Sequence, residues 1–414
     1  MRSANIRYLP QIDHLRALAA VWIVLFHGVF LIGPTFAPMD AVKAVHGTPT
    51  LNPLYALLTE GHTAVSLFMV LSGFVFTVGT FGRAVSYKDF IVNRVLRIYP
   101  LYVAVLLLYL SDEHIPKSFS DLATTVLPLA DFHWDEGRVL VPMDWAVSVE
   151  LQFYLLFPFI LGFLNRNPLR TTVSIIAVAL AFRVIDVGDW ANPRDLAYGH
   201  LMGRIDQFAL GMFTATLFLR WQGRETLFRA VFAASALSTV LLIWAYQSLG
   251  GGQDSVANWK LLWPTAEGAA WSGVVLGYVG MRQKLPARAA RLAGRIGEMS
   301  FSIYLLHRWI IGAFALRPWA ELRPTGRWDM DALLTTAALV LPVTLAVSVL
   351  TYNVIEKPFL SLRRRYVSPA TAAPGGLPGG LLGSPALVTA ASAVAEAERP
   401  RPLIRAPERE RFPT

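Results

Sequence analysis

The sequence predicts an all-α membrane protein of about ten transmembrane helices with both termini in the cytoplasm. Three observations support this prediction: few charged residues, apolar runs that recur along most of the chain, and basic residues concentrated in alternate loops. Of the 414 residues, 54% are hydrophobic and 16% are charged, whereas a soluble domain usually carries roughly 25% charged residues. The composition therefore argues against a water-soluble globule and for a protein whose surroundings are a lipid bilayer.

Each predicted span is an apolar stretch bounded by polar, Pro or Gly segments. A helix needs about 20 residues to cross a hydrocarbon core of ~30 Å. The predicted spans are residues 12–33, 62–81, 95–111, 146–164, 171–188, 203–221, 226–249, 261–281, 298–316 and 332–355. The first run follows Arg2 and Arg7 without a convincing cleavage site, so we expect a retained span and not a signal peptide.

The basic residues indicate how these spans are oriented. The formal net charge is +9, which in a soluble protein would suggest nucleic acid as a partner. Here Lys and Arg concentrate in the N-terminal segment and in every second loop after it, as they do in the cytoplasmic loops of membrane proteins. We therefore expect cytoplasmic termini and no nucleic-acid partner.

The composition changes near residue 366. Residues 1–366 contain all the predicted spans, whereas residues 367–414 are rich in Pro, Gly, Ala and Ser and end in a charged run. A segment of this kind buries too little apolar surface to offset its chain entropy. We expect a membrane domain over 1–366 and a disordered cytoplasmic tail over 367–414.

The sequence lacks the residues and motifs that several types of catalysis require. The chain has no cysteine, which excludes disulfides, thiolate catalysis and cysteine-ligated metals. The motifs of serine hydrolases, zinc proteases, P-loops and dinucleotide sites are absent too. No metal site and no permanently bound cofactor are predicted.

Arg16 and His27 share one face of the first predicted span. They are eleven residues apart, which is about three helical turns and ~16 Å of rise. An ionisable side chain inside a span is costly and usually faces a polar cavity, so His27 is a candidate catalytic residue. The alternative is a histidine that is hydrogen-bonded to a neighbouring helix.

Two further features at the inner halves of the spans suggest ligand binding. Arg94 and Arg97 are three residues apart, so both guanidiniums lie on one helix face and can bind phosphates. Ordinary basic flanks of a span are the alternative. Ser72 and Gly73 form a small-residue notch that admits either a neighbouring helix or a thin ligand chain.

Glu150 and Tyr154 are i, i+4 neighbours at the outer end of the span 146–164. Counted along their helices, Glu150 and His27 have similar depth. Glu150 is therefore expected to hold the His27 imidazole in one tautomer, as a carboxylate does in hydrolase triads. The alternative is that Glu150 forms an ion pair with Arg204 or Arg183 and serves folding.

Other ionisable residues inside spans have mainly structural interpretations. We expect one ion pair between Arg204 and Asp206 and another between Arg183 and Asp186. His307 is a weaker catalytic candidate than His27, with a packing role preferred.

Seven segments in series resemble the acyltransferase-3 family of membrane O-acyltransferases. They are LPQIDHLRALAAVWIVLFH, LFMVLSGFVFT, RVLRIYPLY, WAVSVELQFYLLFP, GRIDQFALGM, MSFSIYLLH and YNVIEKPF, and they cover about residues 9–360. The family's motif residues fall on Arg16 and His27, on Arg94 and Arg97, on Trp145, Glu150, Phe153 and Tyr154, and on Glu356. The chain departs from the family pattern at His14, where glycine is usual, and at Ala146, where serine is usual.

The resemblance implies a ten-helix domain that moves an acyl group, commonly acetyl, from cytoplasmic acyl-CoA to a hydroxyl acceptor. The acceptor would be a carbohydrate, a glycolipid or a similar molecule, and the site would lie in the cytoplasmic membrane. Arg94, Arg97 and Arg16 would bind the donor phosphates. His27 would act as a general base or carry the acyl group transiently.

A proton-coupled small-molecule transporter is the alternative function. Buried Arg, Asp and His residues also line proton-coupled pathways in transporters. The Arg-x10-His and Arg-x-x-Arg segments favour the enzyme.

Overall fold

The computed structural model describes residues 8–47, 50–111, 118–127, 129, 141, 143–189, 199–251, 257–282, 285–317 and 322–368. Within these residues every regular element is a helix, apart from an isolated bridge between Val85 and Val367. The all-α prediction is therefore confirmed. The predicted tail begins at residue 367, but Val367 is buried and pairs with Val85, so the prediction is wrong at this boundary. Residues 369–414 lie outside the described residues.

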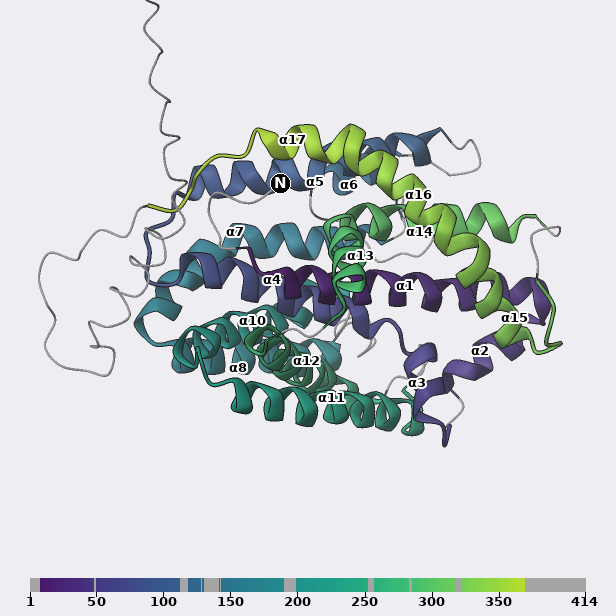
Figure 1. Cartoon of the computed structure of the whole chain (residues 1–414), viewed down its shortest axis with the longest axis horizontal. Coiled ribbons are helices and arrows are strands. Elements are labelled where there is room, and N and C mark those ends of the chain that lie inside the picture. The colour runs from purple at the N-terminus through teal and green to yellow at the C-terminus, as the bar shows by residue number, and fades with distance from the viewer. Residues whose placement is uncertain are drawn as a thin grey trace, which may run out of the picture. The chain divides into compact units, whose positions relative to one another are not determined.

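Each predicted span coincides with a long helix or with a run of consecutive helices (Figure 1). These helices are α1 (Pro10–Phe36), α4 (Thr63–Thr80), α5 (Tyr87–Leu110), α7 (Asp144–Arg166), α8 (Pro168–Asp189), α10 (Leu201–Arg220), α11 (Glu225–Ser248), α12 (Trp263–Gly280), α14 (Ser300–Ala315), and the run α15 (Trp328–Thr335), α16 (Leu341–Thr351) and α17 (Lys357–Ser361). Two π-helical turns, Thr336–Val340 and Tyr352–Glu356, join the last three. Shorter helices are α2 (Met39–Gly47), α3 (Pro53–Thr59), α6 (Phe119–Val126) and α13 (Ala287–Glu298).

Among the described residues, seven helices are long and apolar enough to cross a membrane: α1, α4, α5, α7, α8, α11 and the run Trp328–Ser361. The helix α14 has only 16 residues, fewer than the roughly 20 that a crossing needs. In α10, Arg204, Asp206 and Gln207 interrupt the apolar run. A multi-pass membrane architecture is therefore confirmed, while the total of ten spans stays a prediction.

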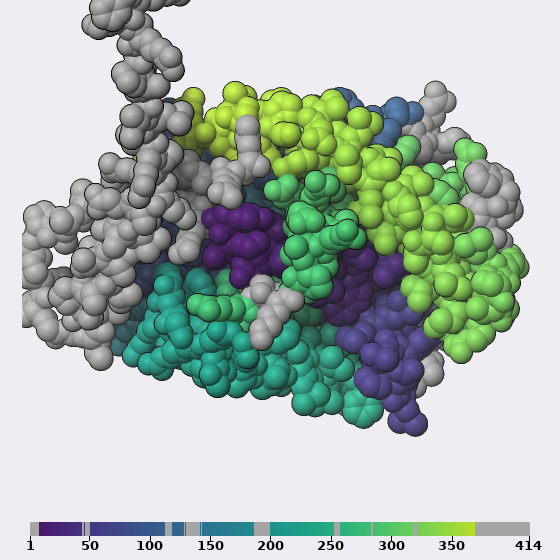
Figure 2. All heavy atoms as spheres, viewed as in Figure 1, coloured from purple at the N-terminus to yellow at the C-terminus, as the bar shows by residue number. Residues whose placement is uncertain are grey.

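The first helix lies among the others and contacts α4, α12, α13, α14 and α15. Figure 1 shows α13 crossing α1, and in Figure 2 purple atoms of α1 are visible on both sides of α13. A Cβ on Gly297 of α13 would lie 1.9 Å from the backbone oxygen of Asp13. Only glycine permits this close crossing over the N-terminal turns of α1.

Gly73 of the predicted notch serves helix packing, as one of its two interpretations predicts, while its neighbour Ser72 lines a cavity described below. A Cβ on Gly73 would lie 2.1 Å from the backbone oxygen of Phe208, and a Cβ on Gly211 would lie 2.1 Å from that of Val70. The backbones of α4 and α10 therefore touch at two glycines, as small residues allow in membrane helices.

Arg183 and Arg204 both form ion pairs, but each pairs with a carboxylate other than the predicted one. Arg183 pairs with Asp206 at 2.8 Å, with both side chains fully buried, and Arg204 approaches Glu267 at 3.8 Å. The expected pairing of Arg204 with Asp206 is wrong, and the side chain of Asp186 lies outside the described residues. Each arginine pairs with a carboxylate on another helix, because a buried charge is tolerated only beside an opposite charge and hydrogen-bond partners.

Candidate active site

Two cavities adjoin where α1, α4 and α5 meet. We call them the Glu150 cavity and the Arg363 cavity, after one residue of each. They hold about 810 Å³ and about 930 Å³ of empty space, including space open to solvent. Their walls share Arg16, Phe76, Arg94 and Arg97, so three arginines stand at the boundary between the two spaces.

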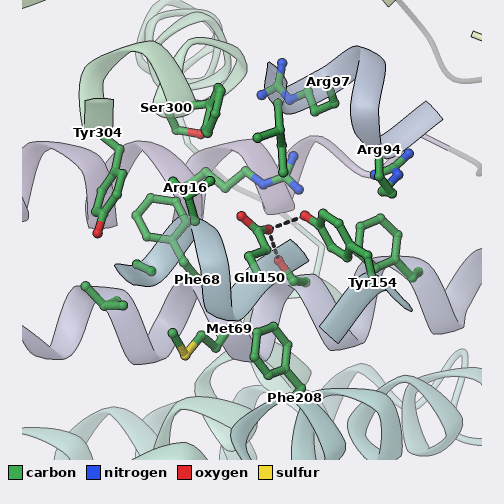
Figure 3. A pocket seen from close by; sticks show the side chains of 17 residues that line it. Arg16, Phe68, Met69, Arg94, Arg97, Glu150, Tyr154, Phe208, Ser300 and Tyr304 are labelled. Carbon is green, nitrogen blue, oxygen red and sulfur yellow. Dashed lines mark hydrogen bonds between the residues drawn. The ribbon is translucent and has the colours of Figure 1, made fainter. Parts of the chain in front are cut away.

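Most side chains that line the Glu150 cavity are apolar. Its polar lining residues are Arg16, Ser72, Arg94, Arg97, Glu150, Tyr154, Ser300 and Tyr304, several of which are labelled in Figure 3. All the predicted donor-binding residues therefore line one cavity, together with Glu150.

Arg94 lies among aromatic rings. Its guanidinium carbon is 4.6 Å from the ring centroid of Phe76, 5.5 Å from that of Phe90 and 5.7 Å from that of Tyr154. Cation–π contacts of this kind hold an arginine without neutralising its charge. No described carboxylate pairs with Arg94, and its buried Nε has no hydrogen-bond partner there. The group therefore retains donors for an anion.

Arg97 has a different environment from Arg94. Its Nη1 donates to Glu356 Oε2 at 2.7 Å, and the Glu356 carboxylate is fully buried. Ser302 donates to the other oxygen of Glu356. Glu356 sits in the second π-helical turn, a feature often found at functional sites. The pair joins α5 to the last helical run and fixes the direction of Arg97.

The Arg363 cavity is lined by a fourth arginine, Arg363, for which the sequence predicted no role in the site. Arg363 follows α17 and lines this cavity with Arg16, Arg94 and Arg97. Burial, together with the positive charges of Arg94 and Arg97, lowers the pKa of Arg363. Arginine nevertheless stays charged in proteins, so Arg363, Arg94 and Arg97 repel one another. Arg16 lies 3.5 Å from the carboxylate of Asp13. A bound anion would relieve this repulsion.

Glu150 does not pair with His27, Arg183 or Arg204. Ser72 Oγ donates to Glu150 Oε1 at 2.9 Å, and the Tyr154 hydroxyl donates to the same oxygen. Figure 3 shows the carboxylate facing the cavity, with the Arg16 side chain reaching across beside it. Both alternatives predicted for Glu150 are thus absent from the structure. Oε2 has no described partner and remains available to a ligand.

His27 forms its hydrogen bond with His307 on α14. His27 Nδ1 and His307 Nε2 are 2.9 Å apart, and the two ring planes differ by 29°. Similar depth in the membrane did not bring Glu150 to His27, because the rotation of α7 points that carboxylate toward α4. The sequence favoured a packing role for His307. In the structure its ring also forms a hydrogen bond with the candidate catalytic residue His27.

His27 does not line either cavity. Tyr304 lines the Glu150 cavity, and its ring centroid is 5.8 Å from that of His307. The Tyr304 hydroxyl is buried and has no hydrogen-bond partner in the described chain. Tyr304 therefore contacts both the Glu150 cavity and the histidine pair, and the sequence analysis did not single out this residue.

The described residues contain no group of three or more His, Asp or Glu side chains that could hold a metal ion. The two cavities are lined by guanidiniums, hydroxyls and the carboxylates of Asp13, Glu150 and Glu298, and the imidazole pair lies nearby.

Comparison with known proteins agrees with the resemblance. The model of the acyltransferase-3 family, described as an acyltransferase domain, matches residues 9–353. The acyltransferase MdmB of Streptomyces mycarofaciens is 26% identical over 391 residues, covering 87% of this chain and 95% of MdmB. The exopolysaccharide production protein ExoZ of Rhizobium meliloti (strain 1021) is 28% identical over 317 residues, covering 73% of this chain and 90% of ExoZ.

A protein of Staphylococcus aureus (strain COL), provisionally named an O-acetyltransferase, is 24% identical over 177 residues, covering 38% of this chain and 25% of that protein. No solved structure matches the chain. The family match spans nearly all of the predicted membrane domain. It includes every motif residue named above except Glu356, which lies three residues beyond its end. The chain therefore belongs to the acyltransferase-3 family of membrane acyltransferases.

Proposed function

We propose that this membrane O-acyltransferase takes an acyl group, most simply acetyl, from acyl-CoA and transfers it to a hydroxyl of a carbohydrate or glycoconjugate. The observation that carries the proposal is the arginine cluster between the two cavities, with Arg94 free of any described carboxylate. The cytoplasmic membrane is the proposed location. Family membership favours this enzyme over the transporter that the sequence had left open.

The arginine cluster suits the phosphates of a CoA donor. Arg94 and Arg363 line the Arg363 cavity and form no described ion pair, whereas Arg97 is oriented by Glu356 and Arg16 lies 3.5 Å from the Asp13 carboxylate. Guanidiniums bind phosphate oxygens through two parallel hydrogen bonds. The mostly apolar Glu150 cavity then offers space for the thin pantetheine arm beyond the phosphates.

The proposed reaction centre lies past the Glu150 cavity. In this proposal His27 takes the acceptor's hydroxyl proton, or carries the acyl group before the acceptor arrives. The Tyr304 ring lines the cavity and lies 5.8 Å from the His307 ring, so in this proposal the thioester would approach His27 beside this ring. Glu150, which keeps Oε2 free, would bind the donor or a hydroxyl.

The acceptor proposal is supported by a relative's name. ExoZ is named for exopolysaccharide production, and a polysaccharide presents the hydroxyl groups that O-acyl transfer requires. Mass spectrometry of glycans from cells with and without the gene tests this part. Identical acyl content in the two samples would contradict a carbohydrate acceptor.

Donor binding is tested with purified protein and acetyl-CoA. The chain has no cysteine, so a thiol reagent reports only the CoA that is released. We expect saturable binding of radiolabelled acetyl-CoA and catalytic CoA release, both weakened in Arg94→Ala. The matched control is Arg229→Ala, since Arg229 is an exposed residue that pairs with Glu225 far along the chain from either cavity. Absence of binding by the well-folded protein would overturn the donor assignment.

A further inference from the structure

The hydrogen bonds of His307 determine its own tautomer. His307 is fully buried on α14, and its Nδ1 lies 2.6 Å from the backbone oxygen of Tyr304 and 3.2 Å from that of Ile303. A carbonyl oxygen can only accept a hydrogen bond, so Nδ1 of His307 carries a hydrogen. These carbonyls belong to the preceding turn of the same helix, and the orientation of the ring therefore needs no ligand.

This tautomer in turn determines the hydrogen positions on His27. A neutral imidazole has one N–H, so His307 Nε2 is an acceptor. His27 Nδ1, at 2.9 Å, is within the normal range for an N–H donor. His27 thus donates from Nδ1, and its Nε2 bears the free lone pair.

A charged His307 would reverse this assignment but lacks stabilising groups. A buried imidazolium requires a carboxylate or several acceptors. No described Asp or Glu forms an ion pair with His27 or His307, and the one described histidine–carboxylate pair is His62 with Glu60. Arg308, the next residue along the chain, adds a positive charge. The neutral pair is therefore the favourable state.

We infer that His307 is a positioning residue: it holds His27 as the Nδ1–H tautomer and so presents the Nε2 lone pair of His27 to the reacting group. The inference rests on the proposed function in one respect, the reactivity of His27. His307 thus takes the place that the sequence had assigned to Glu150, and Glu150 is left to the donor cavity.

The assignment gives a balanced proton path. His27 Nε2 accepts the hydroxyl proton while the acceptor oxygen bonds to the acyl carbon and the carbon–sulfur bond breaks. The resulting His27 imidazolium keeps its Nδ1–H bond to His307 Nε2, which stabilises the positive charge. His27 Nε2–H then returns the proton to the CoA thiolate. The products are an ester and free CoA thiol.

The first test reads the tautomer directly. In ¹⁵N-histidine-labelled protein, the chemical shifts of His27, assigned by the loss of its signals in His27→Gln, should show a protonated Nδ1 and an unprotonated Nε2. In His307→Leu the Nε2–H tautomer of His27 should gain population, because Nδ1 loses its imidazole acceptor and only the backbone of Ile23 remains as a described hydrogen-bond partner of this ring. A wild-type His27 protonated on Nε2 alone would overturn the inference whatever the activity.

The second test separates positioning from folding. With acetyl-CoA as donor and water as acceptor, His307→Leu should lower kcat by about 100-fold or more with the KM for acetyl-CoA little changed. His307→Gln should recover at least a tenth of the wild-type rate, since its amide oxygen accepts from His27 Nδ1. His14→Gln is the matched control, because His14 is a buried histidine of α1 that bonds Tyr278 outside both cavities.

The outcomes distinguish the two proposals. Equal loss of kcat in His307→Gln and His307→Leu, with both folded, would overturn the positioning role and leave the proposed function standing. Full activity in a folded His27→Gln protein would instead overturn the reactivity of His27. If His307→Leu does not fold, the wild-type tautomer still decides the inference.

Discussion

The Arg97 guanidinium lies 2.7 Å from the Glu356 carboxylate, whereas Arg94, one turn earlier on the same helix, faces three aromatic rings and no described carboxylate. The two arginines of the Arg-x-x-Arg pair therefore have different surroundings. Arg94 keeps its charge for a ligand, and Arg97 links two parts of the helical domain. Their substitutions should consequently have different effects.

Arg94→Ala should raise the Kd for acetyl-CoA about 10-fold or more with little change in thermal stability. A charge-assisted hydrogen bond contributes roughly 1.5–3 kcal/mol, and no described ion pair is broken. Arg94→Lys should restore only part of the affinity, because it keeps the charge and loses the planar fork. Isotope-labelled acetyl-CoA binding measures the effect, and an unchanged Kd in Arg94→Ala would remove this residue from the donor site.

Arg97→Ala should lower stability as well as donor affinity, because it leaves the buried Glu356 charge without its partner. Removing one member of a buried pair costs roughly 3–5 kcal/mol of stability. The Arg97 side chain is 22% exposed, so we expect a loss of stability of about 3 kcal/mol or less. Thermal unfolding followed by tryptophan fluorescence checks the loss. The double variant Arg97→Ala/Glu356→Gln should regain part of it; a double variant no more stable than Arg97→Ala would show that the pair is not the cause.

Arg363→Ala should weaken acetyl-CoA binding, because this residue completes the cluster of like charges around the Arg363 cavity. Removal of one repelling guanidinium should at the same time leave the unliganded protein at least as stable. Arg365→Ala, at an exposed position outside both cavities, is the control. Equal affinities of the two variants would mean that Arg363 does not contact the donor.

Glu150→Gln should raise the KM of CoA release, because the free Oε2 acceptor in the donor cavity is replaced by an amide NH2, and it should leave protein yield and thermal stability nearly unchanged. The carboxylate forms no described ion pair, and a glutamine can still accept from Ser72 and Tyr154 at one oxygen. Steady-state kinetics of CoA release and a melting curve test both parts. Parallel loss of yield, stability and activity would instead assign Glu150 to folding.

Gly73→Ala should destabilise the contact between α4 and α10, since its Cβ would lie 2.1 Å from the backbone oxygen of Phe208. Neither backbone can move without displacing its neighbours, so we expect a clear fall in melting temperature. Gly162→Ala on α7 is the matched control, because its Cβ would meet no atom within 4 Å. Alanine is favoured over glycine there by about 1 kcal/mol. Equal melting temperatures would contradict the tight crossing.

The amino-acid sequence was enough to predict the class of protein and the positions of the long helices, but not the short helices α2, α3, α6 and α13. The share of apolar residues and the length of the apolar runs decide whether a segment lies in lipid, where the backbone has to satisfy its own hydrogen bonds as a helix. Local spacing also placed Arg94 beside Arg97 and Glu150 beside Tyr154, because residues three or four apart share a helix face.

The tertiary structure decided which of these faces meet. Glu150 accepts a hydrogen bond from Ser72 and not from His27. Arg183 on α8 forms an ion pair with Asp206 on α10. His27 faces His307, which lies 280 residues later. Depth along a helix follows from counting residues, but the partner of a side chain depends on how each helix is rotated and which helix packs beside it. Those choices are set by contacts such as the glycine crossing of α4 with α10, which join residues far apart in the chain and leave no local periodic pattern.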